Sequence, residues 1–126
     1  MNNENPNVRS ILLVENDLTF SLLLRDVIEG FGYVVEYAPS APAAEAIVPS
    51  GEPVDLLIAD IELKAGCDGF ELARRLRSLR PGIHILYISG DARRTAAEMG
   101  DVNAPILQKP VPLDELKNAI SEALSE

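Results

Sequence analysis

Short apolar runs alternate with amphipathic segments along almost the whole chain. A run of four to six apolar residues suits a buried strand, while apolar residues repeating every three or four positions indicate a helix. The pattern predicts five strands, at 10–14, 33–37, 54–59, 83–88 and 104–108. It also predicts five helices, at 19–30, 41–47, 70–79, 92–99 and 112–124, of which the fourth is short and weakly amphipathic.

Turn and cap residues separate these elements. Gly30 and Gly32 end the first helix, Ser40 is placed to cap the second, and Pro81-Gly82 ends the third. Regular alternation of strand and helix with short loops is typical of a parallel sheet covered on both faces. We therefore expect an α/β fold, a flavodoxin-like doubly wound three-layer sandwich with strand order 2-1-3-4-5.

The composition fits one small domain. The chain has 126 residues, 47% of them hydrophobic, which is enough for a real core. Residues 1–7 are polar and are expected to form a flexible tail before a domain at 8–126. Neither a transmembrane stretch nor a signal peptide is apparent, so a cytoplasmic protein without membrane association is the expectation.

Charge and cysteine content exclude several classes of function. The formal net charge is −9 and the chain has no basic run, which argues against direct binding of nucleic acid. One cysteine, Cys67, cannot form an internal disulfide, and Cys67 with the single His84 makes no structural zinc set. We interpret His84, at the start of a strand, as structural.

Polar side chains follow four of the five expected strands. Asp60 follows the third, Glu15-Asn16-Asp17 follow the first, Ser89 follows the fourth, and Lys109 follows the fifth. Parallel strands bring their carboxyl ends to one edge of the sheet, where open α/β sheets bind their ligands. Carboxylates, a hydroxyl and an ammonium group converging around Asp60 suit a divalent cation and a phosphoryl group.

These residues carry a resemblance to the receiver domains of two-component response regulators, over nearly the whole chain. The matching segments are 11–17, 55–60, 68–73, 87–90 and 108–110. The resemblance implies that Asp60 accepts a phosphoryl group from a histidine kinase or a histidine phosphotransfer protein. It also implies that Ser89 and Lys109 bind the phosphoryl oxygens, and that the peptide bond between Lys109 and Pro110 is cis.

The resemblance further implies a Mg²⁺ site. Its ligands would be Glu15, the residue at position 16, Asp60 and the main-chain carbonyl of Glu62. Asn16 stands where the family usually has a second acid, so Mg²⁺ affinity should be weak. Glu15, or Asp17 if the loop turns it inward, would then carry more of the cation. We expect the Glu62 side chain to be solvated.

Three other departures from the family pattern concern the switch. Ile106 stands where many receivers have an aromatic residue that moves inward after phosphorylation. The stretch from Ser89 to Lys109 is short, so the fourth helix should be abbreviated. Lys64 replaces a common proline in the loop over the site. The response should therefore depend mainly on Ser89 and the loop after the fourth strand. The output partner should bind the face formed by helix 92–99, the fifth strand and the last helix.

The sequence thus predicts a bacterial signalling switch, stand-alone or excised from a larger protein, whose only chemistry is autophosphorylation and autodephosphorylation. It is not expected to be an enzyme in any other sense. A pseudo-receiver, which binds a partner without phosphorylation, is an alternative that Asn16 favours. A relay intermediate is a second alternative. A flavin or nucleotide site is the least favoured, because no glycine-rich loop follows the first strand.

Overall fold

Five parallel strands form one sheet in the order β2-β1-β3-β4-β5. The computed structural model describes residues 8–91 and 104–125 of the chain. The strands are β1 (Ser10–Val14), β2 (Val34–Ala38), β3 (Leu56–Asp60), β4 (His84–Ser89) and β5 (Ile106–Gln108). The expected order and parallel direction are confirmed. All four polar strand ends consequently lie at the same edge of the sheet.

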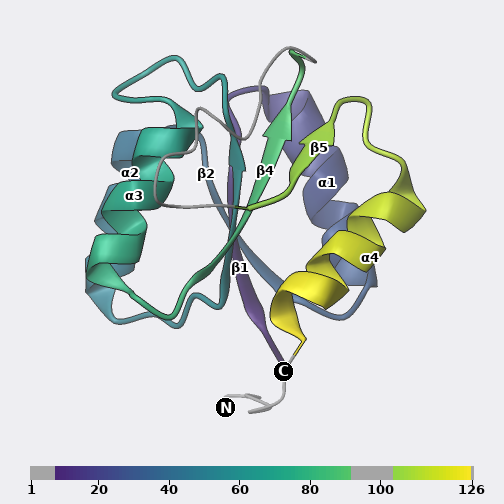
Figure 1. The fold of residues 1–126 in the computed structure, drawn as a ribbon, viewed down its shortest axis with the longest axis horizontal. Helices are drawn as coiled ribbons and strands as arrows, with labels where there is room; N and C mark the ends of the chain where they lie inside the picture. Colours follow the sequence, from purple (N-terminus) through teal and green to yellow (C-terminus); the bar gives the residue numbers. More distant parts are fainter. Residues whose placement is uncertain (1–7, 92–103, 126) are drawn as a thin grey trace.

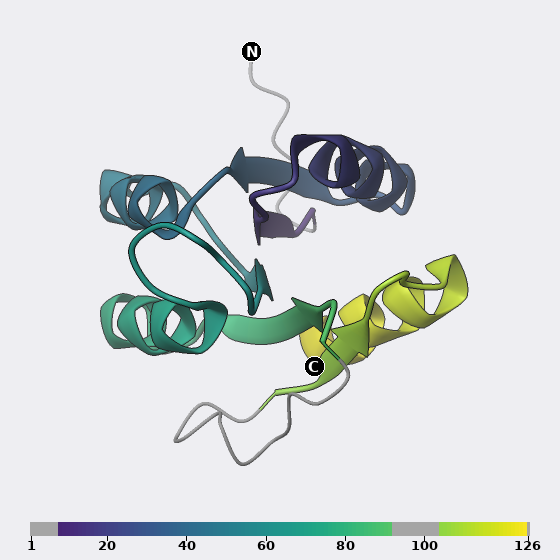
Figure 2. The same ribbon diagram turned by 90° about the horizontal axis from the view of Figure 1, so that it is seen from above.

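Helices cover both faces of this sheet (Figure 1). They are α1 (Leu18–Gly30), α2 (Ala41–Ile47), the 3-10 turn η1 (Val48–Ser50), α3 (Gly69–Leu79) and α4 (Leu113–Leu124). Seen from above, α1 and α4 lie on one side of the strands and α2 and α3 on the other (Figure 2). The three-layer sandwich is therefore confirmed. Among the described helices, none is long and apolar enough to cross a bilayer.

The expected helix at 92–99 and the expected tail at 1–7 lie outside the described residues. The other elements were predicted to within about two residues at each end. The fifth strand is shorter than expected. The carbonyl of Pro105 accepts from the Tyr87 N–H at 3.0 Å. Proline has no N–H to donate, so regular pairing begins only at Ile106.

Side-chain caps fix where three helices start. Asp17 accepts a hydrogen bond from the Phe20 N–H, Ser40 from the Ala43 N–H, and Asp68 from the Glu71 N–H. Each cap satisfies a backbone donor that the helix itself cannot. The expected cap at Ser40 is thus confirmed, and Asp17 and Asp68 cap the first and third helices in the same way.

Two hydrophobic clusters, one on each face, hold the layers together. Strand β3 is buried along its whole length because it is central and covered on both sides. Its alternate residues belong to opposite clusters. Leu57 and Ala59 pack on the side of α2 and α3, whereas Leu56 and Ile58 pack on the side of α1 and α4. The last residue of this rigid strand is Asp60, which pairs in register with Ile88 of β4.

Gly69, the first residue of α3, lies against the backbone of Asp60 and Ile61. A Cβ at this position would come within 2.5 Å of the Asp60 carbonyl oxygen and 2.8 Å of the Ile61 Cα. The Gly69 N–H donates to the Ile61 carbonyl at 2.9 Å, which holds the start of α3 in place. Backbone atoms cannot move aside as a flexible side chain can, so only glycine fits here.

We predict that Gly69→Ala lowers the free energy of unfolding by about 1–3 kcal/mol, the usual cost of overpacking. Urea denaturation measures this. The control is Gly82→Ala, since a Cβ at Gly82 meets no atom within 4 Å. It should change stability by no more than about 1 kcal/mol. Equal effects of the two substitutions would contradict the close-approach argument.

Candidate functional site

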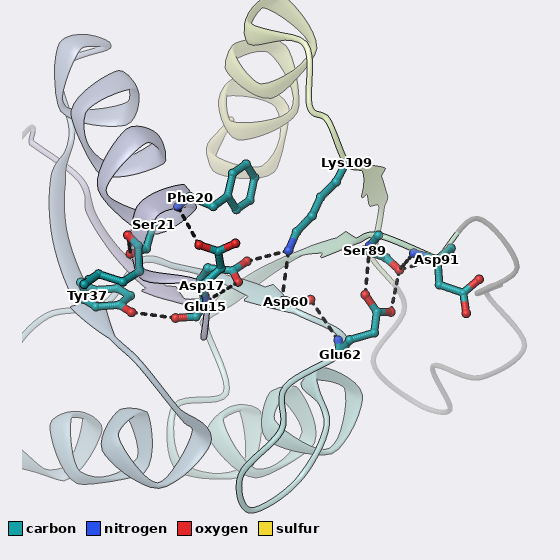
Figure 3. Close-up of polar contacts among 12 residues, drawn as sticks. Glu15, Asp17, Phe20, Ser21, Tyr37, Asp60, Glu62, Ser89, Asp91 and Lys109 are labelled. Atoms are coloured by element: carbon teal, nitrogen blue, oxygen red, sulfur yellow. Dashed lines mark hydrogen bonds and ion pairs between the residues drawn. The ribbon is translucent and has the colours of Figure 1, made fainter.

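The carboxyl ends of four strands bring Glu15, Asp60, Ser89 and Lys109 to one edge of the sheet (Figure 3). Glu15 is 1% exposed, Asp60 3% and Ser89 0%. Acids and hydroxyls are seldom buried so completely unless they are paired. The convergence that the sequence predicted is therefore present, and the partners of each side chain show what the arrangement can do.

Lys109 neutralises the two buried carboxylates. Its Nζ lies 3.0 Å from Glu15 Oε1 and 3.3 Å from Asp60 Oδ2, and the ring of Phe20 lies 4.7 Å away on the α1 side. Burial by itself would lower the pKa of the Lys109 ammonium, but its contacts with Glu15 and Asp60 raise that pKa above the ordinary value. Lys109 is thus charged at neutral pH. The expected cis bond between Lys109 and Pro110 is also present.

Two hydrogen bonds hold Glu15, one at its side chain and one at its main chain. Its Oε2 accepts from the Asp17 N–H at 2.8 Å, and its own carbonyl accepts from the Tyr37 hydroxyl at 2.8 Å. Burial, together with the charge of Asp60, raises the pKa of the Glu15 carboxyl above its ordinary value. Within the described part of the chain, the contact of Glu15 Oε1 is its ion pair with the Lys109 ammonium at 3.0 Å.

Asn16 lies against both carboxylates, whereas Asp17 does not. With its amide nitrogen turned toward the acids, Asn16 donates to Asp60 Oδ2 at 3.2 Å and to Glu15 Oε2 at 3.1 Å. Asp17 is exposed, and its carboxylate caps helix α1 through the Phe20 N–H at 3.1 Å. The inward turn considered for Asp17 is therefore wrong, because the orphan N–H of the helix holds its side chain.

The Glu62 side chain is the largest departure from the expected site. Its Oε2 accepts from the Ser89 hydroxyl at 2.7 Å and its Oε1 accepts from the Gly90 N–H at 2.9 Å. Its backbone N–H donates to Asp60 Oδ1 at 3.0 Å. The expectation that this side chain is merely solvated is wrong, since the two donors at the end of β4 fix it. Sequence pattern carries no signal for this contact beyond the presence of an acid near Asp60.

The remaining residues considered from the sequence lie away from this cluster. Ile106 is half-buried against the α2 and α3 side of the core, and Lys64 is exposed. His84 is exposed at the start of β4, the end of the strand opposite to Ser89. Cys67 is half-buried, and burial raises the pKa of its thiol above the ordinary value. Phe20, a residue of α1, also borders the site through its contact with Lys109.

The donor set fits a hard divalent cation with few protein ligands. Glu15 and Asp60 are adjacent buried carboxylates, and Glu15 Oε1 is a buried oxygen without a hydrogen bond. Mg²⁺ needs only one or two carboxylates because it keeps several waters. Across residues 8–91 and 104–125, no group of three or more histidine, cysteine or acidic side chains gathers into a richer metal centre. Asn16 takes the place of a third acid and must rotate its amide to offer oxygen.

Known proteins with similar sequences include response regulators and sensor proteins. The response regulator receiver protein CpdR of Brucella abortus (strain 2308) is 34% identical over 120 residues, covering 93% of this chain and 98% of CpdR. The sensor protein EvgS of Escherichia coli O157:H7 is also 34% identical over 120 residues, but the chain spans only 10% of EvgS. Similar domains thus occur both alone and within much longer proteins.

Solved structures of receiver proteins superpose on this fold. A response regulator receiver protein from Sinorhizobium medicae WSM419 has a TM-score of 0.86 at 29% identity, covering 95% of this chain and 97% of that one. The response regulator protein TrrA of Thermotoga maritima, in complex with Mg²⁺-BeF, has a TM-score of 0.83 at 25% identity, covering 93% of this chain and 100% of TrrA.

The family model of the response regulator receiver domain matches residues 11–121. Apart from Ser10, this match spans the five strands and most of the last helix, and it includes every residue of the cluster around Asp60. The chain therefore belongs to the response regulator receiver domain family of two-component signal transduction.

Proposed function

We propose that this receiver domain is a phosphorylation-operated switch and that Asp60 is its phosphoacceptor. The observation that carries the proposal is the Asp60 carboxylate, buried at a rigid strand end with the Lys109 ammonium 3.3 Å away. An Asp60 oxygen attacks the phosphorus of a phosphohistidine on a kinase or phosphotransfer protein. The P–N bond breaks, and the histidine leaves with the bond electrons. Lys109 offsets the negative charge that gathers on the phosphoryl oxygens.

Glu15, Asp60, the Glu62 carbonyl and a rotated Asn16 would hold Mg²⁺ in this scheme. When bound, the cation supplies charge neutralisation between the acceptor carboxylate and the phosphoryl oxygens. The Mg²⁺-BeF complex of TrrA supports a cation in a fold of this kind. Two carboxylates and one amide are a weaker set than three acids, so Mg²⁺ affinity should be low. Slow autodephosphorylation by water completes the cycle, and no other turnover is part of this proposal.

The switch is read by a partner that distinguishes the two states. We place that surface at β5, α4 and the segment before β5, part of which lies outside the described residues. A second candidate is a pseudo-receiver that binds its partner without phosphorylation. The Asn16 amide favours it, because this amide donates to one oxygen of Asp60 and one of Glu15 without any cation. Phosphorylation of Asp60 decides between the two.

We predict that incubation with acetyl phosphate and Mg²⁺ adds one phosphoryl group, labile to base and hydroxylamine, and that Asp60→Asn abolishes it. Intact mass spectrometry measures the addition. Asp26→Asn, at an exposed position of α1, is the matched control and should label like the native protein. Labelling of Asp60→Asn would refute the assignment, and a native protein that no donor or kinase labels would favour the pseudo-receiver.

We predict that Asn16→Asp tightens Mg²⁺ binding by about tenfold, or about 1.4 kcal/mol, because it adds charge next to a hard cation. Calorimetry of Mg²⁺ binding measures this. Without Mg²⁺ the same substitution should lower the free energy of unfolding by about 1–3 kcal/mol, since it replaces two hydrogen bonds with like-charge repulsion. Asn118→Asp, exposed on α4, adds the same charge elsewhere. Unchanged affinity in Asn16→Asp would mean that position 16 does not ligate the cation.

We predict that beryllofluoride shifts the amide resonances of Gly90, Asp91 and β5 in the native protein and that Ser89→Ala removes most of this shift. The reason is that the Ser89 hydroxyl is the donor able to contact the added group and pull on the end of β4. Ser78→Ala, on the exposed side of α3, is the control. A full shift pattern in Ser89→Ala would show that another group couples the site to β5.

A further inference from the structure

Ser89 is not poised toward Asp60 in this structure. Its Oγ lies 2.7 Å from Glu62 Oε2 and 3.2 Å from the Asp91 carbonyl, and it accepts from the Asp91 N–H at 2.9 Å. Asp60 is not among its partners in the described part of the chain, and the contacts drawn in Figure 3 run from Ser89 to Glu62 and Asp91. The hydroxyl expected to bind the phosphoryl group is therefore committed elsewhere.

A serine hydroxyl has one proton, so it can fully donate only one hydrogen bond at a time. Of its two acceptors, the Glu62 carboxylate is both nearer and stronger than the Asp91 carbonyl. Donation to a phosphoryl oxygen on Asp60 therefore requires that the bond to Glu62 breaks. The two contacts exclude each other, and the relative strength of Glu62 as an acceptor sets how readily Ser89 moves.

Glu62 also contacts the Gly90 N–H and the Asp60 carboxylate, the other two groups whose contacts must change when Asp60 is phosphorylated. Its Oε1 accepts from the Gly90 N–H at 2.9 Å, so both carboxylate oxygens are tied to the end of β4. Its backbone N–H donates to Asp60 Oδ1 at 3.0 Å. One residue thus joins the acceptor carboxylate to the hydroxyl and to the next backbone amide. We name the contacts of the Glu62 carboxylate with Ser89 and Gly90 the Glu62 clamp.

We infer that the Glu62 clamp is a built-in brake on the switch, and that Glu62 is a positioning residue that holds Ser89 and the end of β4 in the resting arrangement. Phosphorylation then works against the clamp, because the phosphoryl group must replace the Glu62 carboxylate as the acceptor of the Ser89 hydrogen bond. The inference rests on the proposed function for its role in signalling. The clamp itself is a property of the protein without any phosphoryl group.

The test is beryllofluoride affinity, with Mg²⁺ present, in a double-mutant cycle of Glu62→Ala and Ser89→Ala. Glu62→Ala should tighten binding about tenfold when Ser89 is present, since a hydrogen bond to a charged group no longer competes. In the Ser89→Ala background the same change should alter affinity by no more than about twofold, which measures the effect of removing a nearby negative charge. A purely structural role for Glu62 would instead weaken binding in both backgrounds.

Two variants sharpen this test. Glu62→Gln keeps an oxygen acceptor without charge, so its affinity should lie between those of the native protein and Glu62→Ala. Glu36→Ala removes an equal charge at an exposed position of β2 and should leave affinity unchanged. Equal tightening by Glu62→Ala with and without Ser89 would show that Glu62 acts by charge alone, and the clamp would be wrong.

A second measurement needs no ligand and separates this inference from the proposed function. Hydrogen exchange of the Gly90 amide should be about tenfold faster in Glu62→Ala than in the native protein, because that N–H loses its acceptor. If the native protein takes up no beryllofluoride, the proposed function fails, and the exchange rate still decides whether the clamp exists. Unchanged Gly90 exchange would overturn the clamp whatever the beryllofluoride result.

Discussion

Two carboxylates buried on neighbouring strands are the constraint that the rest of the site depends on. Glu15 and Asp60 would repel each other and lose hydration, a combination that is strongly unfavourable without compensation. Lys109 provides that compensation from β5, two strands away from β3, within 3.3 Å of both acids. The lysine can reach them because the strand order puts the ends of β1, β3 and β5 around one edge of the sheet. The strand order is thus what allows the charges of the two acids to be balanced.

Most donors at this edge are already committed in the resting molecule. The Asn16 amide and the Lys109 ammonium contact Glu15 and Asp60, and the Ser89 hydroxyl donates to Glu62. A group arriving at Asp60 cannot add contacts without removing existing ones, because each donor has few protons to offer. Such competition is what gives a site two alternative arrangements. A ligand shifts the population between them only by its difference in contacts.

The sequence determined the fold and the position of the site. Continuous apolar runs and helical spacing give five strands and the helices between them, because central parallel strands and amphipathic helices have distinct periodicities. Caps such as Ser40 are local interactions and were therefore readable too. Since carboxyl ends of parallel strands share one edge, the sequence pattern by itself groups Glu15, Asp60, Ser89 and Lys109.

Only the tertiary structure decided how those side chains are paired. Ser89 and Glu62 are 27 residues apart, and Lys109 and Asp60 are 49 apart, so no local pattern specifies their rotamers. From the sequence, the Asp17 side chain could point either toward the site or toward the start of α1. In the folded chain it accepts a hydrogen bond from the Phe20 N–H. Periodicity fixes which face a residue occupies. The partner of a buried polar group is fixed instead by competition among all donors and acceptors brought within reach, which exists only in the folded chain.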